Sequence, residues 1–187
     1  MHRIIRELHW RKHRKMLSEL QLLILDVDGV LTDGGLWLDQ NGEVQKRFDA
    51  RDGLGLLLLK QNGIKLALVS GGSGGATEKR AQQLGIEYCL VEVKDKTSVV
   101  VALQTELVIA VENTCFLGDD LNDLVVRSKV GLLLSTCDGC RPLRRQADAV
   151  LTSKGGYGAV RELAERILKA RDEWSELESQ GWRDSNC

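Results

Sequence analysis

Short apolar runs alternate with amphipathic segments along most of the chain, and this alternation limits the folds that the chain can adopt. The apolar runs are predicted to be strands, at residues 21–27, 65–70, 88–93, 114–119, 130–135 and 148–152. The segments between them are predicted to be helices, at residues 53–63, 75–85, 95–107, 120–129 and 140–147. Near-continuous apolar strands that alternate with helices are typical of a mostly parallel sheet covered on both faces. The pattern therefore predicts an α/β fold, a Rossmann-like three-layer sandwich.

One stretch after the first strand breaks this rhythm. The apolar "LWL" at 36–38 and the segment "VQKRF" at 44–48 flank the turn signal "DQNG". Two short runs on either side of such a turn predict a β-hairpin. No room remains for a cap domain, because one helix and one strand fill the interval between Ser70 and Lys96.

Length and charge limit the number of domains and the partners. A chain of 187 residues with 43% apolar content is long enough for one compact domain. The formal charge of −1 gives no overall basic field for nucleic acid. We predict a basic N-terminal helix at 1–19, a main domain at 20–170 and an acidic tail at 171–187. A basic start can bind nucleic acid or membranes, but its apolar positions at helical spacing favour a solvated amphipathic helix.

The sequence predicts a cytoplasmic protein. It contains no apolar run of transmembrane length, and its N-terminus lacks the features of a signal peptide. Five cysteines, an odd number, fit a reducing compartment better than a disulfide framework. Cys137 and Cys140 have the spacing of a redox or metal motif, but no second ligand pair accompanies them in the body of the chain. We interpret them as two thiols on a loop.

Histidine chemistry is largely excluded from the body of the protein. All three histidines, His2, His9 and His13, lie in the first thirteen residues. A Ser-His-Asp or Cys-His mechanism, or a metal bound by histidine, would have to use this N-terminal segment. Any catalysis is therefore expected to use carboxylates, hydroxyls, lysine and a hard metal ion.

Acidic residues follow two of the predicted strands. Asp26 and Asp28 end the first strand, and residues two apart in an extended chain project to the same side. Asp119 ends another strand, and Asp123 lies one helical turn further on. Close carboxylates repel one another unless a proton or a cation lies between them. Oxygen ligands without histidine or cysteine suit Mg²⁺.

Groups that suit an anion follow two further strands. Ser70 ends its strand and precedes Gly71 and Gly72, whose amides can point at an anion. Lys96 opens a helix and can neutralise phosphate charge. Carboxylates, a hydroxyl, a lysine and magnesium together suit phosphoryl transfer.

These residues resemble the motifs of a known family. "DVDGVLTDG" at 26–34 resembles the first motif of the haloacid dehalogenase superfamily of phosphohydrolases, and Ser70, Lys96 and "GDDLND" at 118–123 fall in the order of its other three. The resemblance implies that Asp26 is the nucleophile, that Asp28 is the general acid and then base, and that Ser70 and Lys96 bind phosphate. It also implies a Mg²⁺ ion held by Asp26, Asp119 and the main-chain carbonyl of Asp28. Asp123 is expected to support Lys96 or the metal shell.

A narrower resemblance concerns the substrate. "FDARDG", "VKDK" and "GGYGAVRELAERIL" are similar to a capless subfamily of 3-deoxy-manno-octulosonate 8-phosphate and nonulosonate 9-phosphate phosphatases. It implies a sugar-acid phosphate substrate, a homotetramer whose neighbours help to close each site, Thr32 in the pocket and Arg51 as a contact for the sugar acid. After the second-motif residue the octulosonate enzymes typically read Gly-Arg-Ser and the nonulosonate enzymes often Gly-Glu, whereas this chain has Gly72 at the discriminating position.

Two other classes of protein use similar residues. A phosphorylated receiver domain combines Asp, Thr or Ser, Lys and Mg²⁺, but its phosphoacceptor follows a later strand than the first. A catalytically silent oligomeric module is the second alternative, because the glycine-rich "SGGSGG" at 70–75 is compatible with a decayed pocket. Hydrolysis of an aryl phosphate with and without Mg²⁺ separates an enzyme from a silent module.

Overall fold

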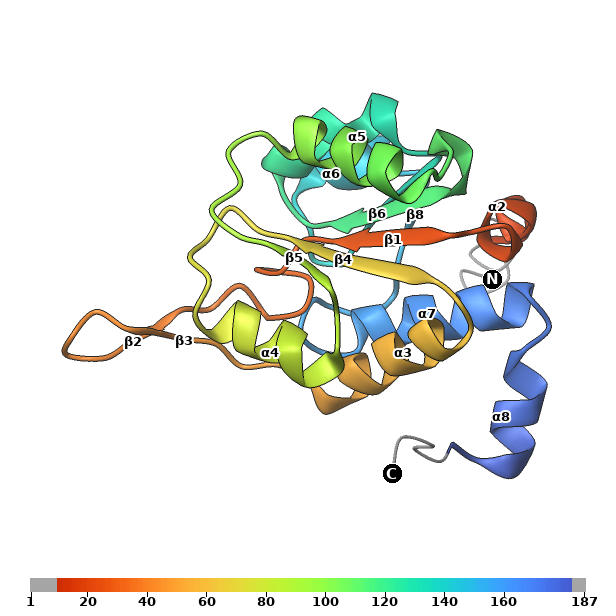
Figure 1. The fold of residues 1–187 in the computed structure, drawn as a ribbon, viewed down its shortest axis with the longest axis horizontal. Helices are drawn as coiled ribbons and strands as arrows, with labels where there is room; N and C mark the ends of the chain where they lie inside the picture. The colour runs from red at the N-terminus through yellow and green to blue at the C-terminus, as the bar shows by residue number, and fades with distance from the viewer. Residues whose placement is uncertain (1–9, 183–187) are drawn as a thin grey trace.

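Six parallel strands form the central sheet of the computed structural model, which describes residues 10–182 (Figure 1). Their order across the sheet is β5–β4–β1–β6–β7–β8, and every neighbouring pair is parallel. The strands are β1 (Leu22–Leu25), β4 (Lys65–Val69), β5 (Tyr88–Leu90), β6 (Thr114–Gly118), β7 (Leu132–Ser135) and β8 (Ala149–Val150). Each falls within a predicted apolar run, so the parallel α/β sheet is confirmed.

Helices cover both faces of the sheet, which makes three layers (Figure 1). One face carries α3 (Ala50–Gln61), α4 (Ala76–Leu84) and α7 (Ala159–Ala170), and the other carries α5 (Lys96–Leu107) and α6 (Arg141–Gln146). Strand β1 shows how the layers are joined. Leu23 and Leu25 belong to one apolar cluster, and Leu22 and Ile24 belong to the second. This alternation is what a strand buried on both faces requires.

Two helical segments differ from the prediction. Residues 121–129 form a 3₁₀ helix, η2 (Leu121–Lys129), whose first turn is closed by a capping box between Asp120 and Asp123. Helix α7 was absent from the predicted helices, although its buried residues have helical spacing: Ala159, Val160, Leu163, Ala164, Ile167 and Leu168. The shorter elements are α2 (Arg14–Ser18), η1 (Val111–Asn113) and α8 (Trp174–Gln180).

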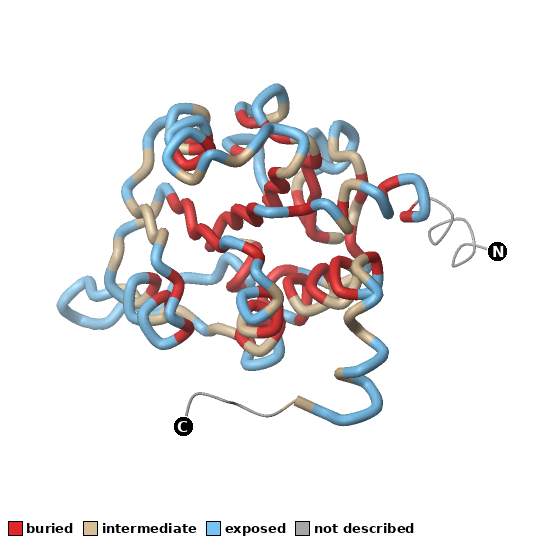
Figure 2. The backbone as a smooth tube through the Cα atoms, turned by 45° about the vertical axis from the view of Figure 1, so that its right-hand side comes forward, coloured by how far each residue is buried: buried red, intermediate tan, exposed pale blue. Residues whose placement is uncertain are grey.

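The predicted hairpin is present and projects away from the body of the molecule (Figure 1). Strands β2 (Trp37–Leu38) and β3 (Val44–Gln45) are antiparallel. The carboxylate of Asp39 accepts hydrogen bonds from the amides of Asn41 and Glu43 and so fixes the turn. Figure 2 shows that the hairpin is almost entirely exposed. In the described chain, this hairpin is the insertion between β1 and α3, and no cap domain covers the strand ends.

The two ends of the described chain pack onto the central domain. Trp10 and Leu17 lie in the larger core cluster, and Trp174 of α8 packs against it. Arg14 and Asp172 form an exposed ion pair at 2.8 Å. Residues 1–9 of the predicted basic segment lie outside the described residues, and the domain boundaries stay a prediction. Within residues 10–182, no helix combines the length and apolar character needed to cross a bilayer.

Candidate active site

Most of the predicted site residues gather where three central strands end. Asp26 follows β1, Ser70 follows β4 and Asp119 follows β6, and these strands are neighbours in the sheet. They border a hollow of about 440 Å³ that is lined by Asp26, Asp28, Ser70, Gly71, Gly72, Asp119, Asp120, Leu121 and Asn122. A hollow of about 740 Å³ lies between α2 and the end of α7, but it contains none of the predicted site residues. Ligands of parallel α/β sheets bind at the carboxyl ends of strands, which favours the first hollow.

Lys96 joins two of the carboxylates. Its ammonium lies 3.1 Å from Oδ2 of Asp26 and 2.6 Å from Oδ1 of Asp123, and all three side chains are buried. Burial by itself lowers the pKa of Lys96, but the two carboxylates outweigh it and raise that pKa. Burial, followed by the charge of Asp123, raises the pKa of Asp26 to about 6. The lysine therefore carries its positive charge directly beside Asp26.

Asp123 is fully engaged within the protein. One oxygen accepts from Lys96, and the other accepts from the amides of Asp119 and Asp120 at 2.8 and 3.2 Å. This pattern fits the predicted supporting role, because both carboxylate oxygens of Asp123 already accept hydrogen bonds from the protein. The capping box that shapes η2 thus also fixes the main chain of Asp119.

The arrangement of oxygens fits a hard cation. Carboxylate oxygens of Asp26, Asp119 and Asp123 lie within 4.8 Å of one another. Within residues 10–182, Oδ1 of Asp119 is buried and has no hydrogen-bond partner. Burial, followed by the charges of Asp26 and Asp123, raises the pKa of Asp119 to about 8. A buried oxygen that lacks a partner beside excess negative charge is the environment that a divalent ion stabilises.

The negative charge gathered at Asp26 and Asp119 predicts how Mg²⁺ binding depends on pH. The pKa values of Asp26 and Asp119 are raised to about 6 and about 8, so the folded protein holds protons that the unfolded chain loses at lower pH. These groups therefore make the metal-free protein less stable as pH rises towards about 8. Mg²⁺ needs the deprotonated carboxylates, so its stabilising effect is expected to grow over the same range.

Thermal melting with and without Mg²⁺ at several pH values measures this effect. Asp119→Asn serves as the comparison, because it removes the group with the larger shift. We expect the Mg²⁺-induced rise in Tm to be larger at pH 8 than at pH 6 in the unchanged protein and to be nearly lost in the variant. An equal rise at both pH values would contradict the assignment.

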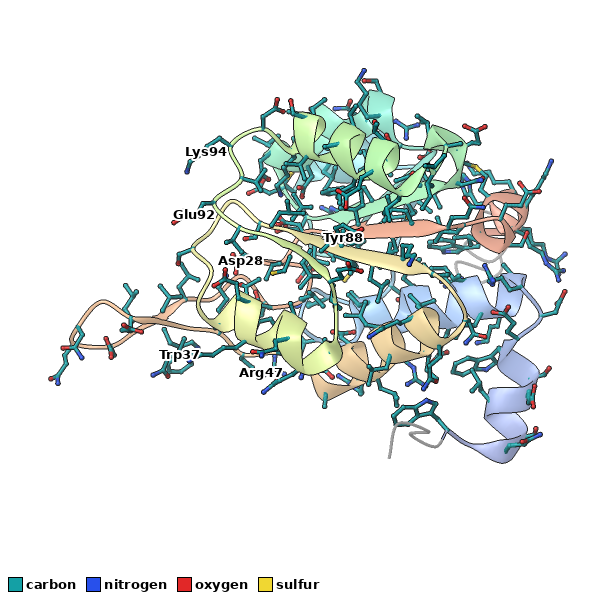
Figure 3. All side chains as sticks on the ribbon, in the orientation of Figure 1. Asp28, Trp37, Arg47, Tyr88, Glu92 and Lys94 are labelled. Atoms are coloured by element: carbon teal, nitrogen blue, oxygen red, sulfur yellow. The ribbon has the colours of Figure 1, made fainter. Side chains whose placement is uncertain are left out.

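Asp28 has two oxygens in different environments. Oδ2 lies 2.8 Å from the ammonium of Lys46, which also donates to the hydroxyl of Thr77 at 3.2 Å. Oδ1 is buried and has no hydrogen-bond partner in the described chain. Figure 3 labels Asp28 near the base of the hairpin, the segment that supplies Lys46. Sequence reasoning did not find Lys46, because a lysine in "VQKRF" resembles an ordinary hairpin lysine.

The loop after β4 is arranged around Ser70. The buried hydroxyl of Ser70 accepts from the amide of Gly72 at 3.1 Å. The amides of Glu92 and Val93 donate to the carbonyls of Gly72 and Ser70 and tie this loop to the chain after β5. Ser70, Gly71 and Gly72 therefore reach the hollow together, as predicted.

Gly29 allows the first loop to approach Asp119. Its φ angle is +87°, and a side-chain carbon at this position would overlap the carboxylate of Asp119. Only glycine satisfies both conditions. The conformation of the loop after β1 is thus matched to the carboxylate that follows β6.

Thr32 and Arg51 are not brought to the hollow by this single chain. Thr32 is fully buried, and its hydroxyl accepts from the amides of Gly29 and Gly34. Arg51 is largely exposed and pairs with Asp49, its helix-capping neighbour, at 2.7 Å. Within the chain Thr32 shapes the first loop, and contact of either residue with a substrate stays a prediction.

The loop with Cys137 and Cys140 packs beside the site through its backbone. The amide of Cys140 donates to the carbonyl of Asp119 at 2.6 Å, and both thiols are free. Because the backbone makes this contact, we expect replacement of both cysteines by serine to leave activity within about twofold and to release no stoichiometric metal. Steady-state assays and metal analysis of the double variant are the measurement. Loss of most of the activity would give the thiols a function that we do not assign.

Comparison with known proteins shows which proteins this chain is similar to. A family model described as haloacid dehalogenase-like hydrolase matches residues 49–126. The 3-deoxy-D-manno-octulosonate 8-phosphate phosphatase of Escherichia coli K12 is 38% identical over 163 residues, which cover 87% of each chain. The Haemophilus influenzae enzyme of the same name is 34% identical over 173 residues, covering 92% of this chain and 96% of its own.

A solved structure agrees with these relatives. The Moraxella catarrhalis phosphatase of the same name, in complex with magnesium, phosphate and KDO, has a TM-score of 0.88 and 35% identity. The match covers 92% of this chain and 99% of that one. The fold, the order of the motif residues and these relatives lead to one conclusion: the chain belongs to the haloacid dehalogenase-like hydrolases, in the group that contains the 3-deoxy-D-manno-octulosonate 8-phosphate phosphatases.

Proposed function

We propose that the protein is a Mg²⁺-dependent phosphoric monoester hydrolase that converts 3-deoxy-D-manno-octulosonate 8-phosphate to KDO and phosphate. The observation that carries the proposal is the grouping of Asp26, Asp28, Ser70 and Asp119 around one hollow, with Lys96 against Asp26. The similarity to octulosonate phosphatases over 87% of the chain supports the choice of substrate.

Each residue has a role that follows from its position. A carboxylate oxygen of Asp26 attacks phosphorus and forms an aspartyl phosphate, while Asp28 gives a proton to the departing sugar oxygen. Asp28 then takes a proton from the water that attacks this intermediate. Ser70 and the amide of Gly71 bind phosphate oxygens, Gly72 supports Ser70 through its amide, and Lys96 offsets the phosphate charge.

Asp26, Asp119 and the main-chain carbonyl of Asp28 would hold Mg²⁺. When bound, Mg²⁺ lowers the repulsion between the phosphate and the attacking carboxylate and stabilises charge in the transition state. Asp123 keeps both Asp119 and Lys96 in place through its three hydrogen bonds.

The four cysteines within the described residues are free, which supports the proposal of a cytoplasmic, reducing location.

Gly72 keeps a second substrate open. It lines the hollow without a side chain, whereas octulosonate enzymes typically carry arginine and nonulosonate enzymes often glutamate there. A nonulosonate 9-phosphate is therefore the alternative substrate. Phosphate release from both sugar phosphates and from an aryl phosphate, with Mg²⁺ and with a chelator, tests the proposal. We expect kcat/KM to be highest for the octulosonate 8-phosphate. A higher kcat/KM for the nonulosonate 9-phosphate would make that compound the substrate instead. If none of the three compounds released phosphate in a metal-dependent reaction, the remaining alternative would be the catalytically silent module.

We also propose that the protein is a homotetramer joined through its hairpins. Leu36, Trp37 and Leu38 are 58%, 70% and 68% exposed on one short segment. Figure 3 shows Trp37 on the hairpin, outside the body of the chain. An apolar strip of this kind on a projecting element is typical of an interface between subunits.

Replacing Trp37 and Leu38 together by serine tests this assembly. Light scattering is expected to show a tetramer for the unchanged protein and smaller species for the variant. Replacement of the exposed Val108, which is 89% exposed on the body of the chain, is the control and should leave the tetramer intact. A monomer at micromolar concentration for the unchanged protein would refute the proposal.

A further inference from the structure

We propose that Lys46 is a positioning residue that holds Oδ2 of Asp28 and so leaves Oδ1 as the oxygen that exchanges a proton with the substrate. The inference rests on the proposed function and assigns a separate task to each oxygen of the general acid. In the first step a proton on Oδ1 passes to the sugar oxygen as its bond to phosphorus breaks and the bond from Asp26 forms. In the second step Oδ1 takes a proton from the attacking water.

The contacts of Lys46 support this division. The ammonium is 2.8 Å from Oδ2 of Asp28, and the lysine side chain is only 3% exposed. It also donates to the hydroxyl of Thr77, which is buried in the first turn of α4. A buried ammonium that donates to both Asp28 and Thr77 has few orientations available, so it fixes the rotation of the Asp28 carboxylate. Oδ1 is left buried and without a hydrogen-bond partner among residues 10–182.

Gly72 leaves room for this pair. A side-chain carbon at Gly72 would lie 3.1 Å from Oδ2 of Asp28 and 3.6 Å from the ammonium of Lys46. The first distance is closer than ordinary van der Waals contact. The missing side chain therefore leaves room for the contact between Oδ2 of Asp28 and the ammonium of Lys46.

Lys46 also links the hairpin to the catalytic carboxylate. It follows the last residue of β3, Gln45, so its backbone position depends on where the hairpin lies. Thr77, on α4, accepts a hydrogen bond from the same ammonium. A hairpin held by neighbouring subunits would thus also hold Asp28 in its productive rotation.

Dependence on the leaving group gives the sharpest test. A sugar alcohol is a poor leaving group and needs a proton from Asp28, whereas 4-nitrophenolate leaves readily without one. For Lys46→Met we expect kcat/KM for the sugar phosphate to fall about 30- to 100-fold, because loss of positioning removes part of the roughly hundredfold or larger contribution of general acid catalysis. The fall for 4-nitrophenyl phosphate is expected to be at least ~10-fold smaller, because kcat/KM covers only the steps through the first phosphoryl transfer.

Further variants separate positioning from general damage. Lys46→Arg keeps the positive charge and is expected to recover part of the activity on the sugar phosphate. Lys65 is an exposed lysine at the start of β4, and Lys65→Met should alter kcat/KM for neither substrate. Adding Lys46→Met to Asp28→Asn should cost little more than Asp28→Asn alone, because both changes remove the same proton transfer.

Equal losses on both substrates, or additive losses in the double variant, would overturn the role of Lys46. If Lys46→Met does not fold, the same comparison is made with Thr77→Val, which removes only the second partner of the ammonium. There a loss confined to the sugar phosphate would support the role, and no selective loss would contradict it. Absence of activity on both substrates in the unchanged protein would instead refute the proposed function.

Discussion

Asp26→Asn is expected to abolish hydrolysis, with kcat reduced at least about a thousandfold for every phosphate monoester. An amide cannot attack phosphorus, and it is a poorer ligand than a carboxylate for a divalent cation. The change also removes the charge that faces Lys96 at 3.1 Å. Steady-state release of phosphate in saturating Mg²⁺ is the measurement.

The control for this variant is a change of the same kind at a distant surface position. Asp172→Asn alters an exposed carboxylate that pairs with Arg14, and it should retain full activity. Burial raises the pKa of Asp26, so replacement by a neutral side chain is expected to leave the protein folded. Melting curves of both variants check this. Retention of a tenth of the unchanged turnover by Asp26→Asn would contradict the nucleophilic role.

Lys96→Met is expected to give the second large effect, on both catalysis and stability. The ammonium is the cation that lies between the buried carboxylates of Asp26 and Asp123. Its removal leaves their charges uncompensated, and breaking such a buried pair typically costs about 3–5 kcal/mol. We expect kcat to fall at least about a hundredfold, because no lysine then offsets phosphate charge. Urea unfolding without metal should show a lower midpoint.

Lys94→Met is the matched control for this change. Lys94 lies two residues earlier, is exposed and points away from the body of the chain in Figure 3. We expect its replacement to change neither turnover nor the urea midpoint. If Lys96→Met were as stable and active as Lys94→Met, the charge balance described for the site would be wrong.

The sequence predicted the architecture well because its strands are buried on both faces. Such strands read as continuous apolar runs, and their carboxyl ends converge at one edge of the sheet. The positions of Asp26, Ser70 and Asp119 at that edge follow from the strand boundaries alone. Helix α7 was missed, although its buried positions repeat at helical spacing.

The remaining features depend on contacts between segments that are distant in sequence. Lys46 and Asp28 are 18 residues apart, and only the return of the hairpin brings the ammonium to Oδ2. Thr32 illustrates the converse, because the family resemblance implied a place in the pocket, whereas its hydroxyl accepts hydrogen bonds from the amides of its own loop. Arg51 likewise pairs with its neighbour Asp49 in the single chain. A motif identifies a residue, but it does not determine which groups that residue's side chain contacts.

The most direct test of the account is detection of a phosphoryl group on Asp26 during turnover. Asp28→Asn is expected to slow hydrolysis of the intermediate, whereas 4-nitrophenyl phosphate can phosphorylate Asp26 without a proton from Asp28. This variant is therefore mixed with 4-nitrophenyl phosphate and Mg²⁺, quenched in acid and analysed by peptide mass spectrometry. We expect one added phosphoryl group on the peptide that contains Asp26, and none with a chelator or after Asp26→Asn. Continued phosphate release with no phosphorylated peptide at any quench time, or with the group on another residue, would contradict the mechanism.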